Sequence, residues 1–147
     1  MRSIGPVCGQ TDGKMTELTY SSFGEQLRAA VPGFERVYNK HLADNGGEVL
    51  PYVLLGDLVP FLSQEVAASR GEESRDLKHA MLLLERAMGS EDRALRDLVA
   101  VAFIEYLEPE DPSFPVIRKL FGPQLEEEYR SQEAWLNARV NGSSSDR

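Results

Sequence analysis

Apolar residues recur every three or four positions along most of the chain, and this spacing is typical of one face of an α-helix. The pattern is clear in residues 20–31, 34–42, 72–88 and 123–140. No series of strand-like segments competes with it, and no internal repeat of roughly 30–45 residues is visible. The chain is therefore predicted to be all-α: an irregular bundle of about six or seven helices in consecutive hairpins, with a solenoid-like stack as the alternative.

Capping residues mark several of the predicted helix boundaries. Ser22, followed three residues later by Glu25, has the spacing of a capping box at the start of the first helix. The pair Gly46–Gly47 suits a left-handed C-cap after the second helix, and Gly89 is placed to end the helix over 72–88. Pro123 is expected to open the last helix, because proline is well tolerated in a first helical turn.

The stretch GGEVLPYVLLGDLVPFL, Gly46 to Leu62, places two acids, Glu48 and Asp57, among mostly apolar residues. A buried carboxylate needs hydrogen-bond donors, because a low dielectric penalises its ionised form. Pro51 suits a first helical turn, and Asp57 comes just before a second helical pattern, LVPFLSQEVAASR. We therefore expect Asp57 to cap a new helix by accepting main-chain N–H bonds, with Gly56 supplying the turn before it.

The most apolar segment of the chain runs from Leu98 to Ile104, inside LRDLVAVAFIEYLEPEDP. We predict a helix that starts at Ser90, forms the centre of the bundle and includes Tyr106 on its inner face. The alternation in VAVAFI resembles a strand, but the length of the segment and its capped start favour a helix. Glu105 in this helix is expected to face solvent or a polar seam.

The same pattern bounds the folded part of the chain. Residues 1–16 are expected to form a disordered extension, residues 17–140 a single helical domain, and residues 141–147 a disordered tail. The N-terminus lacks the apolar core of a signal peptide, and no window is apolar for the roughly 18 residues needed to span a membrane. We therefore expect a cytoplasmic protein.

The charge balance narrows the class of partner. The chain carries 24 acids against 16 lysines and arginines, for a formal charge of −8. Nucleic acids and anionic membranes require a basic surface, so neither is expected as a ligand, and a basic protein is the natural complement. Cys8 is the single cysteine, which leaves no disulfide framework or thiolate metal cluster. No cofactor is predicted, and a monomer or weak homodimer is expected.

Recognisable catalytic motifs are lacking, so no catalytic or metal-binding residue is assigned and an enzyme is not expected. His41 precedes Asp44 by three residues and His79 follows Asp76 by three, so each imidazole could meet a carboxylate on one helical face. The alternative function is accordingly a small metal-dependent hydrolase built from a set of four dispersed residues. That set is His41, Asp44, Glu48 and Asp57.

Four aromatic residues could in principle stack on nucleic-acid bases: Tyr38, Tyr52, Tyr106 and Trp135. A stacking surface of that kind needs interleaved lysines and arginines, which this acidic chain does not supply around them. We therefore interpret these aromatic side chains as core residues or interface anchors.

The region from Glu105 to Glu133 is strongly acidic, with eight acids against Arg118, Lys119 and Arg130, or a net charge of −5. If the last two helices fold back on each other, the motifs EPEDP and LEEE lie at one edge of the molecule. A surface of that sign attracts a cationic partner, although the acids can also serve solubility alone. The predicted partner-binding residues are Glu105, Glu108, Glu110, Asp111, Glu126, Glu127 and Tyr129.

Three motifs carry a family resemblance: DNGGEVLPYVLLGDL, LVAVAFIEYLEPEDP and IRKLFGPQLEEE. Together they resemble small helical bacterial proteins that are encoded beside polymorphic toxins and are taken to be immunity proteins. The resemblance covers Phe34 to Trp135, and the extension before Met15 departs from the pattern. It implies a protein that binds and neutralises a cognate toxin with a basic surface, without catalysis. A helical scaffold or regulatory adaptor is a further alternative.

Overall fold

The computed structural model describes residues 17–145, so the expected extension over residues 1–16, with Cys8, and the last two residues of the expected tail lie outside it. Within residues 17–145 the fold is all-α, as predicted, with seven α-helices, two short 3₁₀ helices and no strand. The elements are α1 (Phe23–Ala30), η1 (Pro32–Phe34), α2 (Glu35–Asp44), α3 (Pro51–Ala68), α4 (Arg75–Met88), α5 (Arg93–Ala102), η2 (Ile104–Tyr106), α6 (Phe114–Lys119) and α7 (Pro123–Ser145).

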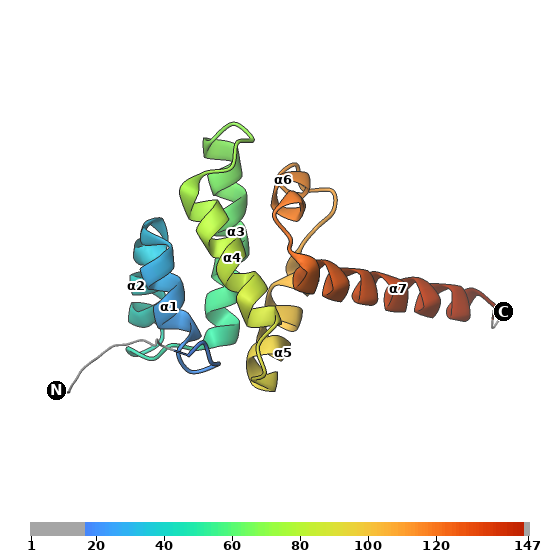
Figure 1. Ribbon diagram of the computed structural model, residues 1–147, viewed down its shortest axis with the longest axis horizontal. Helices are drawn as coiled ribbons and strands as arrows, with labels where there is room; N and C mark the ends of the chain where they lie inside the picture. The colour runs from blue at the N-terminus through green and yellow to red at the C-terminus, as the bar shows by residue number, and fades with distance from the viewer. Residues whose placement is uncertain (1–16, 146–147) are drawn as a thin grey trace.

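Helices α3 and α4 form the centre of the molecule, because α3 contacts α1, α2, α4, α5 and α6, and α4 contacts α1, α3, α5 and α7. Half of the residues of α4 are buried, and they belong to one cluster with the buried leucines of α1, α3, α5 and α7. The prediction that the segment after Ser90 forms the central helix is therefore wrong. Figure 1 shows α1 and α2 on one side of the α3–α4 pair and α6 and α7 on the other.

Helix α7 leaves the rest of the molecule as an arm (Figure 1). Its first turns pack on α4 and η2, whereas every residue from Glu133 to Arg139 is exposed. The helix continues to Ser145, five residues into the stretch for which the sequence predicts a disordered tail. In the part of the chain that the structure describes, no helix is both long and apolar enough to cross a membrane.

The predicted helix start at Asp57 is wrong, because α3 runs without interruption from Pro51 to Ala68. Asp57 and Glu48 are both exposed, so neither carboxylate is buried among apolar side chains. The helix tolerates Gly56 and Pro60, which together cost about 4 kcal/mol in helix propensity. A continuous stripe of five buried side chains outweighs that cost, since burying each one contributes about 1.5–3 kcal/mol. The stripe consists of Leu54, Leu55, Leu58, Leu62 and Val66.

Helix α5, by contrast, is shorter than predicted. It begins at Arg93, where the Oδ1 atom of Asp92, and not Ser90, caps it by accepting the Ala94 N–H at 3.0 Å. After Ala102 the chain passes into the 3₁₀ turn η2, which leaves Tyr106 exposed and not on the inner face. The apolar run does not reveal this helix end, because consecutive buried residues fit an α-helix and a 3₁₀ helix equally well.

Most of the other predicted boundaries are confirmed. Gly46 and Gly47 adopt left-handed φ angles of +67° and +85° after α2, Gly89 follows α4, and Pro123 opens α7. Helix α1 does begin after Ser22, but the predicted capping box is not formed. The Ser22 hydroxyl instead donates to the Glu17 carbonyl at 3.1 Å and organises the turn that precedes the helix.

Candidate functional site

Two hollows lie side by side, on either side of the segment that joins η2 to α6. Leu107 lines both of them. We call the larger one, of about 850 Å³, the apolar groove; it lies between α5–η2 and α7. The smaller one, of about 410 Å³, is the loop pocket between α3 and the η2–α6 segment. The apolar side chains of the groove are Val101, Ile104, Leu107, Tyr129, Trp135 and Leu136.

The wall formed by α7 is positioned by side chains that reach across from other helices. The carboxylate of Glu85 in α4 accepts the main-chain N–H groups of Gln124 at 2.7 Å and Leu125 at 3.0 Å, and so caps α7. Further along, the Gln132 side-chain amide donates to the carbonyl of Ala100 in α5 at 3.1 Å. These bonds fix the first half of α7 and thereby the place of the groove.

The groove is open, apolar and rimmed by acids. Ile104 and Leu107 are buried at its floor, whereas Trp135 and Leu136 on α7 are 59% and 55% exposed. Exposed apolar side chains that join into one patch rimmed by polar residues are typical of interaction sites. Three glutamates line the same hollow: Glu105, Glu128 and Glu133. Among the described residues, no lysine, arginine or histidine lines it.

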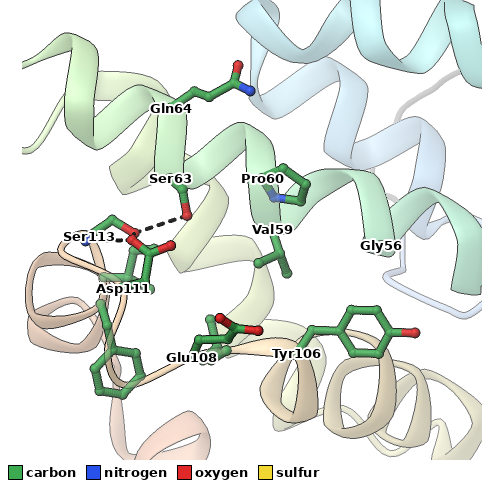
Figure 2. A pocket seen from close by; sticks show the side chains of 12 residues that line it. Gly56, Val59, Pro60, Ser63, Gln64, Tyr106, Glu108, Asp111 and Ser113 are labelled. Atoms are coloured by element: carbon green, nitrogen blue, oxygen red, sulfur yellow. Dashed lines mark hydrogen bonds between the residues drawn. The ribbon is translucent and has the colours of Figure 1, made fainter.

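The loop pocket is organised by Asp111 (Figure 2). Its Oδ1 atom accepts the Ser113 main-chain N–H at 2.9 Å and the Ser113 hydroxyl at 2.7 Å, and Ser113 Oγ lies 3.0 Å from Ser63 Oγ of α3. The Ser113 main-chain N–H, followed by its hydroxyl, lowers the pKa of Asp111. Figure 2 shows Glu108 and Tyr106 further along the same pocket. Asp111 thus holds the acidic loop in place against α3.

The seven predicted partner-binding residues divide into two groups. Four of them are exposed, and none of these four forms an ion pair within residues 17–139. Their charge is therefore open to a partner. This first group consists of Glu105, Glu108, Glu110 and Glu127.

The second group, Asp111, Glu126 and Tyr129, makes internal contacts. Glu126 accepts Arg118 Nη2 and Arg130 Nε, each at 2.6 Å, and the Arg118 bond is the main reason that its pKa falls to about 2. The same Arg118 guanidinium lies 4.5 Å from the centroid of the Tyr129 ring, which also packs on Phe114 at 5.6 Å. Glu126 therefore adds little charge to the surface, whereas Asp111 keeps its charge but is fixed in place by Ser113.

The histidine–carboxylate pairs considered for the alternative hydrolase are not formed. His41 is buried, and its Nε2 atom accepts the Leu50 N–H at 2.9 Å, while Asp44 pairs with Lys40 at 2.8 Å. His79 lies against the Ala30 carbonyl, with Nδ1 at 3.2 Å from the oxygen. Among residues 17–145 no three His, Cys, Asp or Glu side chains are arranged to hold a metal ion.

The four aromatic side chains, interpreted from the sequence as core residues or interface anchors, divide between core and surface. Tyr38 is buried, whereas Tyr52, Tyr106 and Trp135 are 44%, 58% and 59% exposed. Trp135 and Leu136 were not among the predicted partner-binding residues. The sequence signal that could have located this surface is the apolar spacing of α7, which continues beyond the turns that pack on α4 and η2.

A family model described as "Domain of unknown function (DUF7674)" matches residues 24–136. The chain belongs to this family. The DUF7674 match contains every residue that lines the apolar groove and the loop pocket. No curated protein and no solved structure matches the chain.

Proposed function

We propose that this DUF7674 protein is an immunity protein, which binds a cognate bacterial toxin and neutralises it by covering its working surface. The observation that carries the proposal is the set of exposed, unpaired carboxylates beside the open apolar groove. Fixed negative charge attracts a cationic partner, and exposed apolar side chains supply the contacts that hold it. The resemblance of three sequence motifs to proteins encoded beside polymorphic toxins supports the same function.

Within this proposal, the acids that can attract a toxin are those whose charge is not compensated inside the protein. Glu126 is compensated by two arginines, whereas Asp111 keeps its charge but is held in the loop by Ser113. Glu105, Glu108 and Glu110 lie on one short segment between the groove and the loop pocket. We therefore place the centre of the binding face on this segment. Glu127 of α7 is exposed but lines neither hollow.

The proposal is tested by co-expression. Each protein encoded next to the gene for this chain is expressed alone and together with it in a susceptible bacterial host, and growth is recorded. We expect one neighbouring protein to stop growth alone, to be neutralised by this chain, and to elute with it as a complex of fixed stoichiometry. If no neighbouring product is both toxic and bound, the proposal is wrong.

The alternatives are separated by the same experiment. A helical adaptor would bind a neighbouring product that is harmless when expressed alone. A metal-dependent hydrolase using His41, Asp44, Glu48 and Asp57 would retain a stoichiometric metal ion after purification and lose it on His41→Ala. No observation on these four residues favours the hydrolase, because His41 and Asp44 are each hydrogen-bonded to other groups.

A further inference from the structure

We infer that the apolar groove receives a cationic amphipathic helix of the partner, with its large apolar side chains inserted beside Trp135 and Leu136 and its lysines or arginines facing the acidic rim. This inference rests on the proposed function, because the helix belongs to the same partner. The inference specifies the part of the partner that is recognised and the residues of this chain that recognise it. The groove, at about 850 Å³, has room for several large side chains.

The shape of the groove favours a helix as its occupant. One wall is the α7 helix, which presents Leu136 four residues after Gln132 and seven after Tyr129, and the opposite wall is formed by α5 and η2, where Val101 is exposed. A stripe of side chains with this spacing is the kind of surface on which another helix packs. The stripe begins at the buried Leu125, so an added helix would extend a seam that the protein already uses.

The charge of the rim sets the charge of the occupant. Glu105 on η2 and Glu133 on α7 are exposed on opposite sides of the groove, and Glu128 lies on α7 with Glu133. In addition, the guanidinium of Arg139 lies 5.1 Å from the Trp135 ring centroid. The indole therefore already makes the kind of cation–π contact that an arginine of the partner would make. A second copy of this chain fits poorly, because it would bring a rim of the same sign.

Trp135 is the single tryptophan of the chain and reports directly on the groove. The probe is a tryptophan-free peptide of about 14 residues, or about 21 Å of helix, with leucines on one face and lysines on the other. Its binding to the full chain is measured by the blue shift of Trp135 fluorescence and its protection from acrylamide. We expect binding that is lost with a scrambled peptide of the same composition and with a glutamate–leucine peptide of the same pattern.

Two variants assign the binding to the groove. Leu136→Asp, at the exposed wall, is expected to weaken peptide binding about tenfold or more. The matched control Leu82→Asp changes an equally large side chain that is 62% exposed on α4 and lies outside the groove, and it should leave binding unchanged. The double variant Glu105→Gln/Glu133→Gln should weaken binding and flatten its salt dependence. Its control is Glu48→Gln/Glu72→Gln.

Several outcomes would overturn the inference: equal binding of the glutamate–leucine peptide, equal effects of the Leu136 and Leu82 variants, or no binding of the lysine–leucine peptide. A blue shift that grows with protein concentration, without peptide, would show that a second copy covers the groove. Emission already shifted to the blue in dilute protein would indicate coverage by the chain itself. Toxin neutralisation that survives Leu136→Asp removes this inference alone, whereas peptide binding without any neutralised toxin removes the proposed function alone.

Discussion

Gly122 lies so close to Glu85 that a Cβ atom on residue 122 would come within 2.4 Å of the Glu85 Cδ atom. The contact places the Glu85 carboxylate over the first turn of α7, where it accepts the N–H groups of Gln124 and Leu125. The start of α7, and with it one wall of the groove, is therefore fixed by a side chain that is about forty positions away in the sequence.

Glu85→Ala should destabilise the protein by about 1–2 kcal/mol, the usual cost of a lost N-cap. Two main-chain N–H groups at the start of α7 lose their acceptor, and a negative charge leaves the positive end of the helix dipole. Urea unfolding measures the free energy, and hydrogen exchange at Gln124 and Leu125 locates the change. The control Glu72→Ala, in an exposed turn, should stay within about 0.5 kcal/mol.

Gly122→Ala should cost about 1 kcal/mol in the native background, because the new methyl group displaces the Glu85 carboxylate from its two amide donors. In the Glu85→Ala background the same change should cost nearly nothing, since the clashing side chain is gone. A double-mutant cycle of unfolding free energies measures this coupling. Equal costs in both backgrounds would show that Gly122 is required for its backbone and not for the room it leaves.

Asp92→Ala should lower the midpoint of thermal unfolding clearly more than Asp57→Ala does. Asp92 caps α5 with Oδ1, and its Oδ2 atom accepts the Tyr20 N–H at 2.8 Å, which ties the segment before α1 to the start of α5. That bond is also the first cause of the lowered pKa of Asp92. Asp57 is exposed in the middle of α3 and should be nearly neutral. If both variants lowered the unfolding midpoint equally, the helix cap predicted from the sequence at Asp57 would be supported.

Stability should fall between about pH 4.5 and pH 2 in part because of Glu126. The Arg118 and Arg130 bonds hold its pKa at about 2 in the folded protein, against an ordinary value of 4.5. As the pH falls, the unfolded chain therefore takes up this proton first, and the stabilisation present above pH 4.5 is lost as the folded pKa is approached. Glu126→Gln should cost about 1 kcal/mol at pH 7 and flatten this part of the curve. Glu127→Gln, at an exposed neighbour without an ion pair, should leave the curve unchanged.

The helices were predictable from sequence because most of their signals are local. Apolar spacing located the helices, and Gly89 and Pro123 marked true ends. The error at Asp57 arose because Gly56 and Pro60 are strong local signals, whereas the stripe that overrides them matters only once α4 and α5 pack on it. Local propensity is a weak guide wherever tertiary burial contributes more.

The candidate site was predictable in its charge but not in its shape. The acids between Glu105 and Glu133 are visible as a run in the sequence, and Glu105 is exposed as expected. The side chains of Arg118 and Arg130 determine which of these carboxylates is paired, and their positions follow from the packing of α6 and α7. The exposure of Trp135 depends on how far α7 runs beyond its neighbours, which periodicity alone does not reveal.

Charge reversal on the segment between the two hollows should weaken binding of the neutralised toxin. The triple variant changes Glu105, Glu108 and Glu110 to lysine and leaves Asp111 intact, because Asp111 holds the loop through Ser113. These carboxylates are exposed and unpaired in the described part of the chain, so the fold should survive while the field that attracts a cationic partner is reversed.

We expect the association rate constant of this triple variant to fall by about tenfold or more at low salt and to lose its dependence on ionic strength. Rates are measured by stopped-flow mixing with the toxin at several salt concentrations. The control reverses Glu48, Glu72 and Asp97, three exposed acids elsewhere, and so changes the net charge equally. A loss of similar size in the control would mean that total charge, and not this face, attracts the partner. An unchanged rate in the triple variant would remove the acidic face from the binding site.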